Sequence, residues 1–402
     1  MKKRAVITGV GIICGLANNS SEFEKKIFLN NTGIDNISLF DASRMRSQKA
    51  SEVKQEIAKE DDVERLEQFA KIALNEAIED SGVFKRQTRI ENKRISLSFA
   101  TSLAGNEKVM DRLNVVGEQR KPLISHCPNF LNRIKNIAKI NTFSFVTTTA
   151  CASGSGAAGL AYEIIANDLS DIVILGGSDS LTQFASTGFH SLKSLSSSIC
   201  KPFDVDRNGI NIGEGAAFLI VEEYEHAKDR GAYIYGELVG YGICNDAYHM
   251  TSPHPEACGA IRSMKMALKD FEEKIDYVNA HGTATPINDQ VEMKAIENVL
   301  GNQDGDVFVS SNKSMVGHCL GAAGAIELVA SVLAIKHNMV PLNYNLVNPI
   351  SSDESKLKIV REENKKAEVN TVLSNSFAFG GNTASIVVKR IEASINNELG
   401  VI

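Results

Sequence analysis

Short runs of β-branched and aliphatic residues alternate with longer apolar or amphipathic stretches along most of the chain. This alternation predicts an α/β protein with buried sheets. Helical periodicity is clearest over Val63–Ser81, Ala260–Phe271 and Gln290–Leu300. The predicted strands are Ala5–Thr8, Ile95–Phe99, Phe143–Thr149, Ile172–Leu175, Ala217–Val221, Tyr277–Asn279, Val307–Ser311, Thr371–Ser374 and Ala384–Lys389.

Two segments of the chain resemble each other. Cys151–Ile165 and Cys319–Ala330 both contain Gly-Ala-Ala-Gly at the start of an apolar helix, and each follows a β-rich run. Helices that are apolar nearly all round are typical of buried helices. A short resemblance of this kind also arises by coincidence between two glycine-rich helix starts. As a repeat, it indicates two fused halves, which we divide at residues 1–240 and 241–402.

Composition narrows the class of protein. A chain of 402 residues with 43% hydrophobic content can bury a large core and is long enough for two domains. Its 7 cysteines form an odd set without a C-x-x-C motif, which indicates reduced thiols and a cytoplasmic protein. The apolar stretch after Met1 is interrupted by glycines and lacks a small-x-small cleavage site, so we interpret it as a first strand.

Charge and hydropathy exclude two kinds of partner. The net charge of -6 argues against nucleic acid as a general partner, because phosphate neutralisation requires a basic face. We also expect no membrane span, since no apolar run approaches the roughly 20 residues that a bilayer requires.

Cys151 is the first candidate for chemistry. It lies in Val146–Gly159, where β-branched residues give way to small ones, as at a strand-to-helix elbow. A helix N-terminus carries partial positive charge and lowers a thiol pKa, so this position predicts a nucleophile. The alternative is a small buried hydrophobe at a tightly packed turn.

Two histidines follow in comparable places. His281 comes directly after a short predicted strand, on a Gly/Thr-rich loop of the kind on which α/β folds place catalytic residues. His318 comes directly before the second glycine-rich helix. A lone histidine is more often a structural hydrogen-bond partner, but the repeat puts His318 near one elbow as it puts Cys151 at the other, which favours a role for both.

Two more features belong with these residues. Lys313 is in the run before His318 and requires a carboxylate partner if it is buried; Glu327, in the following helix, can supply it. Asn375–Thr383 forms a small-residue turn between two predicted strands. It is either a glycine hairpin or a rigid backbone N–H donor beside the apolar Phe379.

Together these motifs resemble the β-ketoacyl-[acyl carrier protein] synthases, in particular the elongating type, over essentially the whole chain. The motifs are Thr149-Ala-Cys-Ala-Ser-Gly, Asn279-Ala-His-Gly-Thr-Ala-Thr, Lys313-Ser-Met-Val-Gly-His-Cys-Leu-Gly-Ala-Ala-Gly and Asn375-Ser-Phe-Ala-Phe-Gly-Gly. The resemblance implies a thiolase-like fold, usually dimeric. Two pseudo-symmetric βαβαβαββ halves stack as a five-layered αβαβα arrangement, the first carrying the cysteine and the second both histidines.

The resemblance also implies a reaction, the decarboxylative Claisen condensation of malonyl-acyl carrier protein with an acyl thioester on the enzyme. The product is β-ketoacyl-acyl carrier protein, in fatty acid or polyketide chain elongation. The phosphopantetheine arm arrives with the carrier protein, so neither a resident cofactor nor a metal is expected. The implied residues are Cys151 as nucleophile, Cys151 and Phe379 as oxyanion hole with Phe379 as gate, His281 and His318 as enolate donors, Lys313 paired with Glu327 as a fixed charge, and Thr283 and Thr285 as phosphopantetheine ligands.

The chain departs from the family in three places. The segment from Ala100 to the nucleophile looks shorter than in housekeeping enzymes, and there the family lines its acyl pocket and dimer seam. Glu60–Ala70 is acidic where those enzymes often carry basic residues for the carrier. The gate has Ala378 before Phe379 and Asn-Thr after the glycines, where the commonest family form has Gly and Thr-Asn.

These departures leave alternatives open. One is a ketosynthase of a specialised type II polyketide or polyene pathway, forming a heterodimer with a chain-length partner rather than a homodimer. A noncatalytic chain-length partner is argued against by Cys151, since such partners usually lack the cysteine. A thiolase using coenzyme A would lack the run from Lys313 to His318. The accepted acyl length and the identity of the carrier protein are not determined.

Overall fold

The structure is a computed structural model that describes residues 2–57, 63–85, 93–104, 127–351 and 355–391. Its helices are α1 (Ser20–Lys26), α2 (Arg65–Ser81), α4 (Cys127–Ile137), α5 (Ser153–Ala166), α6 (Gln183–Ser191), α7 (Tyr224–Asp229), α8 (Cys258–Ala267), α9 (Pro286–Leu300), α10 (Lys313–Val316) and α11 (Ala323–His337), with short 3-10 helices η1 (Ala150–Ala152) and η2 (Leu320–Ala322). Its strands are β1 (Ala5–Cys14), β2 (Ile34–Asn36), β3 (Lys49–Ser51), β4 (Ile95–Ala100), β5 (Ser144–Thr147), β6 (Ile172–Asp179), β7 (Gly215–Glu223), β8 (Gly236–Asn245), β9 (Tyr277–Asn279), β10 (Val307–Ser310), β11 (Met339–Val340), β12 (Leu357–Ile359), β13 (Lys365–Lys366), β14 (Thr371–Phe377) and β15 (Asn382–Lys389).

Strand order shows that the chain is duplicated. The first half runs β5-β4-β6-β7-β1 and the second runs β10-β9-β14-β15-β8, with β12 added at the outer edge. Numbered within each half, both sheets have the same order, third, second, fourth, fifth and first strand. The predicted thiolase-like fold of two pseudo-symmetric halves is therefore confirmed.

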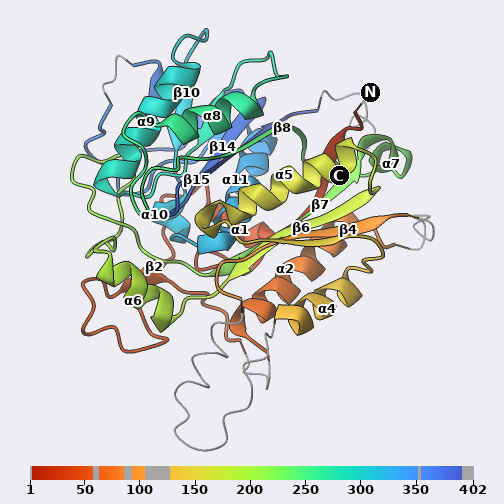
Figure 1. The fold of residues 1–402 in the computed structure, drawn as a ribbon, viewed down its shortest axis with the longest axis horizontal. Helices are drawn as coiled ribbons and strands as arrows, with labels where there is room; N and C mark the ends of the chain where they lie inside the picture. The colour runs from red at the N-terminus through yellow and green to blue at the C-terminus, as the bar shows by residue number, and fades with distance from the viewer. Residues whose placement is uncertain (1, 58–62, 86–92, 105–126, 352–354, 392–402) are drawn as a thin grey trace, which may run out of the picture.

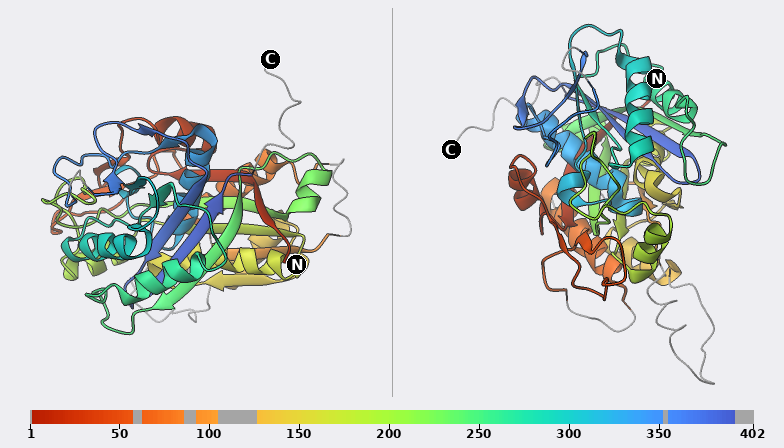
Figure 2. Two further views of the ribbon diagram at one scale, coloured as in Figure 1. Left: turned by 90° about the horizontal axis from the view of Figure 1, so that it is seen from above. Right: turned by 90° about the vertical axis from the view of Figure 1, so that its left-hand side faces the viewer.

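The helices complete five layers (Figure 1). The central layer is the pair α5 and α11, which pack on each other and lie between the sheets of the two halves. Helix α2 covers the outer face of the first sheet, and α8 covers that of the second. Figure 2 shows the same stacking from two further directions. The largest group of buried apolar side chains surrounds α5 and α11, as their nearly uniform apolar sequences predict.

The two sheets join through β1 and β8. Strand β1 pairs antiparallel with β7 along its whole length and with β8 over Ala5–Ile7. The N-terminal residues thus form a first strand, as the glycine-interrupted sequence predicts. The division at residues 240 and 241 falls inside β8 and stays a prediction.

Glycines allow the two central helices to cross. A Cβ atom on Gly154 would lie 2.6 Å from the backbone nitrogen of Ala325, and one on Gly324 would lie 2.4 Å from that of Ser155. Real Cβ atoms do not approach so closely, so only glycine fits at either position.

The crossing also corrects the alignment of the repeat. Each central helix follows a 3-10 turn that begins on a residue with a left-handed backbone, Ala150 (φ 50°) in the first half and Leu320 (φ 52°) in the second. This pairing matches Cys151 with Gly321. The Gly-Ala-Ala-Gly strings of the sequence instead match Gly156 with Gly321, which is five residues out of register, because backbone geometry and not the string of small residues defines the elbow.

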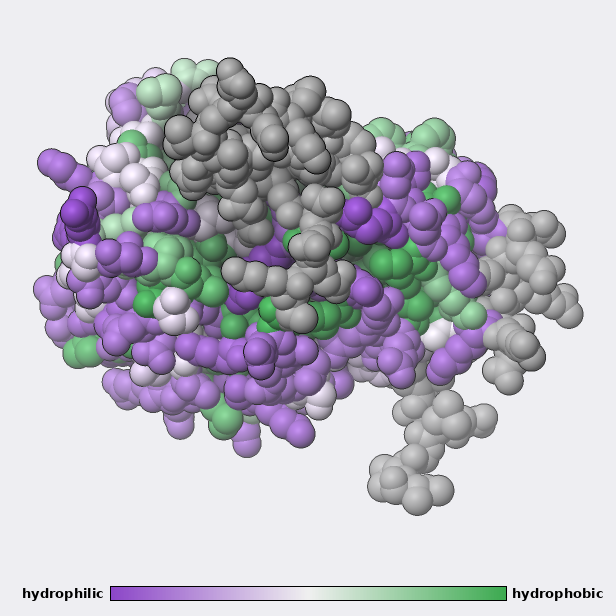
Figure 3. Space-filling view, turned by 90° about the horizontal axis from the view of Figure 1, so that it is seen from below, coloured by the Kyte–Doolittle hydropathy of each residue, from purple (hydrophilic) through white to green (hydrophobic). Residues whose placement is uncertain are grey.

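In the described part of the chain, one segment has the length and composition of a membrane span. Leu320–His337 covers η2 and α11, and 89% of it is buried inside the fold. From the sequence we expected no apolar run of this length. The burial of the segment is typical of a core helix of a folded domain. On the face seen from below, hydrophobic side chains reach the surface between hydrophilic ones (Figure 3).

Candidate active site

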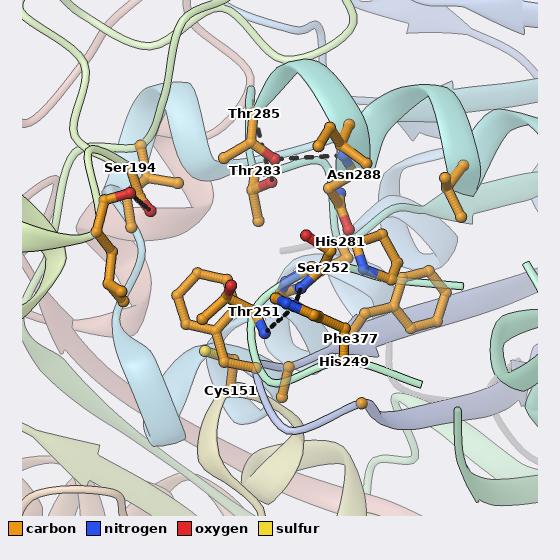
Figure 4. Close-up of a pocket in the computed structure, with 18 of the residues that line it drawn as sticks. Cys151, Ser194, His249, Thr251, Ser252, His281, Thr283, Thr285, Asn288 and Phe377 are labelled. Carbon is orange, nitrogen blue, oxygen red and sulfur yellow. Dashed lines mark hydrogen bonds between the residues drawn. The ribbon is translucent and has the colours of Figure 1, made fainter. Parts of the chain in front are cut away.

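A cavity of about 320 Å³ lies where the two halves meet. The first half contributes Cys151, and the second contributes His281, His318, Phe377 and Phe379. In the view of Figure 4, Thr283 and Thr285 lie at one end of the pocket and Cys151 at the other, with His281 between them. The fold thus brings together residues that are far apart in the sequence.

Cys151 occupies a strained elbow. Ala150 adopts a left-handed backbone at φ 50°, which is costly for a residue with a Cβ atom and must be held by its surroundings. The Ser153 hydroxyl donates to the Ala150 carbonyl at 2.6 Å, and the Thr147 hydroxyl donates to the Ser153 carbonyl at 2.9 Å. These bonds fix the turn that presents Cys151, whose exposed fraction is 8%, to the pocket.

Burial raises the pKa of the Cys151 thiol to about 12, while the positive charge of Lys313 acts in the opposite direction. The start of α5 lowers a thiol pKa, as the sequence suggested, but burial outweighs this effect. The expectation of a lowered pKa is therefore wrong for the pocket without substrate. At neutral pH the thiol is protonated.

His281 and His318 face each other across the pocket. Their ring centroids are 5.5 Å apart, with the ring planes nearly perpendicular. Burial, and next the charge of Lys313, lowers the pKa of each histidine well below its usual range. Both rings are therefore neutral at pH 7, and each has one N–H that can donate a hydrogen bond.

Glu292 positions the loop of His281, and the sequence analysis missed it. Its carboxylate accepts the backbone N–H groups of His281 at 2.8 Å and Gly282 at 2.7 Å. Burial raises the pKa of Glu292 to about 7. The available signal was a carboxylate in α9, the helix that follows the histidine loop. Only the fold shows that this carboxylate points back at the loop.

Lys313 and Glu327 form a buried pair behind the histidines. Their side chains are each about 2% exposed, and the Lys313 ammonium contacts Oε1 of Glu327. Burial raises the pKa of Glu327, whereas the charge and hydrogen bond of Lys313 act in the opposite direction. The partnership suggested by the sequence is present in the structure, between the first residue of α10 and the second turn of α11.

The turn after β14 carries Phe379 into the pocket. Its ring packs against Phe189 of α6, with ring centroids 5.7 Å apart. Within the described ranges, the backbone N–H groups of Phe379 and Cys151 donate to no other residue. Both are therefore free to bind an oxygen atom of a ligand.

Thr283 and Thr285 share a hydrogen bond at the opposite end of the pocket, with 3.0 Å between their hydroxyl oxygens. Thr285 also caps α9 by accepting the backbone N–H of Asn288 at 3.4 Å. Two hydroxyls on one wall can bond the amide groups of an extended ligand.

The described ranges hold no cluster of metal ligands and only parts of two of the segments in which the sequence departs from the family. Within them, no group of three or more His, Cys, Asp or Glu side chains is placed to hold a metal. The segment from Ala100 to Cys151, where the sequence looks short, is described only to residue 104 and again from 127. Residues 60–62 of the acidic stretch also lie outside the described ranges.

A duplicated five-layered fold with a cysteine at the start of one central helix and two histidines from the other half defines an acyl-transferring enzyme of the thiolase-like class. Family comparison gives the finer assignment: "Beta-ketoacyl synthase, N-terminal domain" matches residues 2–227, and "Beta-ketoacyl synthase, C-terminal domain" matches residues 235–347. The chain belongs to the β-ketoacyl synthase family.

Curated relatives and solved structures match this chain over nearly its whole length. The 3-oxoacyl-[acyl-carrier-protein] synthase 2 of Coxiella burnetii is 38% identical, over 97% of this chain and 99% of the relative. Among solved structures, the ishigamide ketosynthase/chain length factor has a TM-score of 0.87 at 29% identity, covering 97% of this chain and 100% of that one. A type II PKS acyl-carrier protein in complex with its ketosynthase bound to the hexaketide has a TM-score of 0.88 at 29% identity, covering 98% of this chain and 100% of that one.

Proposed function

We propose that this enzyme elongates an acyl chain by decarboxylative condensation with malonyl-acyl carrier protein. The observation that carries the proposal is one pocket in which a cysteine at a helix start faces two neutral histidines. The first group suits acyl transfer, and the second suits a developing enolate.

Acyl transfer begins when the Cys151 sulfur attacks an acyl thioester of the carrier protein. The new bond joins sulfur to the acyl carbon, the carrier thiol leaves, and the thiol proton of Cys151 ends on that leaving group. The free N–H groups of Cys151 and Phe379 bind the oxyanion that forms in between. Because the proton is only passed from thiol to thiol, the high pKa of the resting Cys151 is compatible with this step.

Condensation follows when malonyl-carrier protein occupies the pocket. Its carboxylate leaves as CO2, and the electron pair forms an enolate whose oxygen accepts N–H bonds from His281 and His318. The enolate carbon attacks the acyl carbon on Cys151, the sulfur leaves, and one proton from solvent restores the thiol. Two preorganised donors in a dry site stabilise such a charge by several kcal/mol.

Lys313 and Glu327 act on this step through the histidines rather than on substrate. Burial lowers the pKa of both rings, and the ammonium adds to this effect, since a second cation beside it is unfavourable. Thr283 and Thr285 bond the phosphopantetheine arm, which comes with the carrier protein, so the proposed reaction uses no resident cofactor and no metal.

The proposed partners are an acyl carrier protein and a second copy of the chain. Strand β5 ends the sheet in the described part of the chain and pairs only with β4 there. Beside that edge Phe143 and Phe145 are 46% and 39% exposed, which supports a homodimer through β5. Nucleic acid and membrane are not proposed as partners. A cytoplasmic enzyme is supported by the free thiols of Cys14, Cys151, Cys200, Cys244, Cys258 and Cys319.

A second candidate is a polyketide or polyene ketosynthase that pairs with a chain-length subunit. The similarity to the ishigamide ketosynthase/chain length factor favours it. The noncatalytic chain-length role is not proposed, because the cysteine and both histidines share one pocket.

Intact-protein mass spectrometry tests the proposal. The enzyme is incubated with a panel of acyl-carrier proteins and then with malonyl-carrier protein. We expect an acyl mass on Cys151 that disappears as a β-ketoacyl product two carbons longer forms, and no adduct on Cys151→Ala. An adduct retained by Cys151→Ala would exclude this nucleophile; an adduct that appears only with an added chain-length subunit would favour the second candidate.

A further inference from the structure

The turn that carries Phe379 is closed by its own backbone. The Ala378 N–H donates to the Asn382 carbonyl at 2.8 Å, and the Gly381 N–H donates to the Ala378 carbonyl at 3.1 Å. Gly380 and Gly381 both adopt left-handed backbones, at φ 83° and 80°, which lets the chain reverse in so few residues. The turn is thus rigid in itself, and its placement depends on what holds it from outside.

Three hydrogen bonds fasten Gly380 and Gly381 of this turn to the end of β8 and the loop that follows. Two are backbone bonds, from the Gly380 N–H to the Met250 carbonyl at 2.7 Å and from the Asp246 N–H to the Gly381 carbonyl at 2.8 Å. The third comes from a side chain, since Nδ2 of Asn245 donates to the Gly380 carbonyl at 2.8 Å. Gly380 and Gly381 are therefore held by three hydrogen bonds. Of these, only the bond from the Asn245 side chain can be removed by substitution.

The Asn245 amide is almost fully used. Its Nδ2 also donates to Oδ1 of Asn382 at 3.0 Å, and its Oδ1 accepts the Ala247 N–H at 2.7 Å. Packing is equally close, because a Cβ atom on Gly381 would lie 3.1 Å from Oδ1 of Asn245. The partner amide is that of Asn382, the residue that directly follows Gly381.

We propose that Asn245 is a positioning residue that, with Asn382, latches the Phe379 turn in the arrangement needed for catalysis. The latch keeps the Phe379 ring against Phe189 over the pocket and keeps its N–H facing the site. This inference rests on the proposed function, in which that N–H binds an oxyanion beside Cys151.

Two isosteric substitutions separate the latch from general structural effects. Asn245→Asp replaces the Nδ2 donor by an oxygen that faces the Gly380 carbonyl, yet it keeps the acceptor for the Ala247 N–H. Asn382→Asp keeps the oxygen that accepts from Asn245. We therefore expect Asn245→Asp to release the turn and Asn382→Asp to retain it; Asn167→Ala, an exposed asparagine at the end of α5, is the matched control.

Two measurements report whether the Phe379 turn has been released. The first is the rate of Cys151 alkylation by a long-chain maleimide divided by its rate with iodoacetamide, measured at that residue by peptide mass spectrometry. Release of the ring in Asn245→Asp should raise this ratio about fivefold or more. The second is the condensation rate, which should fall about tenfold, the cost of losing one hydrogen bond.

The proposal is overturned if the alkylation ratio of Asn245→Asp equals that of the wild type, or if Asn382→Asp changes it equally. It is also overturned if condensation falls only in proportion to the fraction of folded protein, as circular dichroism measures it. A wild-type enzyme that takes no acyl group would contradict the proposed function instead, and the alkylation ratio would still decide the latch.

Discussion

Nδ1 of His318 accepts the backbone N–H of Leu320 at 3.1 Å. A neutral imidazole has one acceptor and one donor nitrogen, so this bond places the proton of His318 on Nε2. Leu320, whose backbone is left-handed at φ 52°, is also the first residue of the 3-10 turn η2. The second elbow of the repeat thus sets the tautomer of a histidine, where the first elbow presents a cysteine.

This relationship predicts different outcomes for two variants of His318. His318→Gln keeps an N–H group near the Nε2 position, whereas His318→Ala removes it. We expect malonyl-carrier decarboxylation to fall about 100-fold or more in His318→Ala, in line with the loss of one oxyanion donor, and less in His318→Gln. Release of labelled CO2 measures this step. Acylation of Cys151 should persist in both variants. Its loss would contradict the proposal that His318 acts in decarboxylation and not in acyl transfer.

The buried pair of Lys313 and Glu327 predicts a stability defect that can be repaired. Lys313→Met leaves a carboxylate buried without its partner, which costs about 3–5 kcal/mol. The double variant Lys313→Met/Glu327→Leu should recover most of that stability in urea unfolding, because no buried charge remains. Condensation should stay impaired in both variants, since the histidines lose the neighbouring charge. Recovered activity in the double variant would show that the pair serves stability alone.

The raised pKa of Cys151 predicts a pH profile. Thiolate is the reactive form, and a pKa of about 12 means that its fraction rises tenfold per pH unit throughout the accessible range. Alkylation by iodoacetamide should therefore accelerate steadily from pH 6 to 10. A small-molecule thiol, with a pKa near 8.5, should level off within that range. A plateau for Cys151 below pH 8 would show that the helix start outweighs burial.

The helix crossing predicts opposite effects for two glycine substitutions. Gly154→Ala forces a Cβ atom to within 2.6 Å of the Ala325 nitrogen, so we expect it to destabilise the protein by about 1–3 kcal/mol. A Cβ atom on Gly188, in α6, would have no neighbour within 4 Å. Gly188→Ala should therefore be neutral or stabilising by about 0.5–1 kcal/mol. Thermal unfolding compares the two; a destabilisation no larger for Gly154→Ala would contradict the crossing.

Much of the fold follows from local pattern. The strand at Ala5, the helices that became α2, α8 and α9, and the two apolar central helices are visible in the sequence, because periodicity and small-residue content report local geometry and burial. Cys151, His281 and His318 were identified from motifs on strand ends and glycine-rich loops. The pair of Lys313 and Glu327 was predicted on a different ground, namely that a buried lysine requires a carboxylate partner.

The remaining features depend on contacts between distant parts of the chain. The register of the repeat, with Gly321 opposite Cys151, depends on where the backbone turns left-handed and not on the Gly-Ala-Ala-Gly strings. The pKa of Cys151 depends on burial between the halves, which no local motif reports. Glu292 and Asn245 gain their roles because the fold brings a helix and a strand end against loops distant in sequence. A sequence determines local conformation and residue chemistry, but long-range packing sets which groups meet and how strongly water is excluded from them.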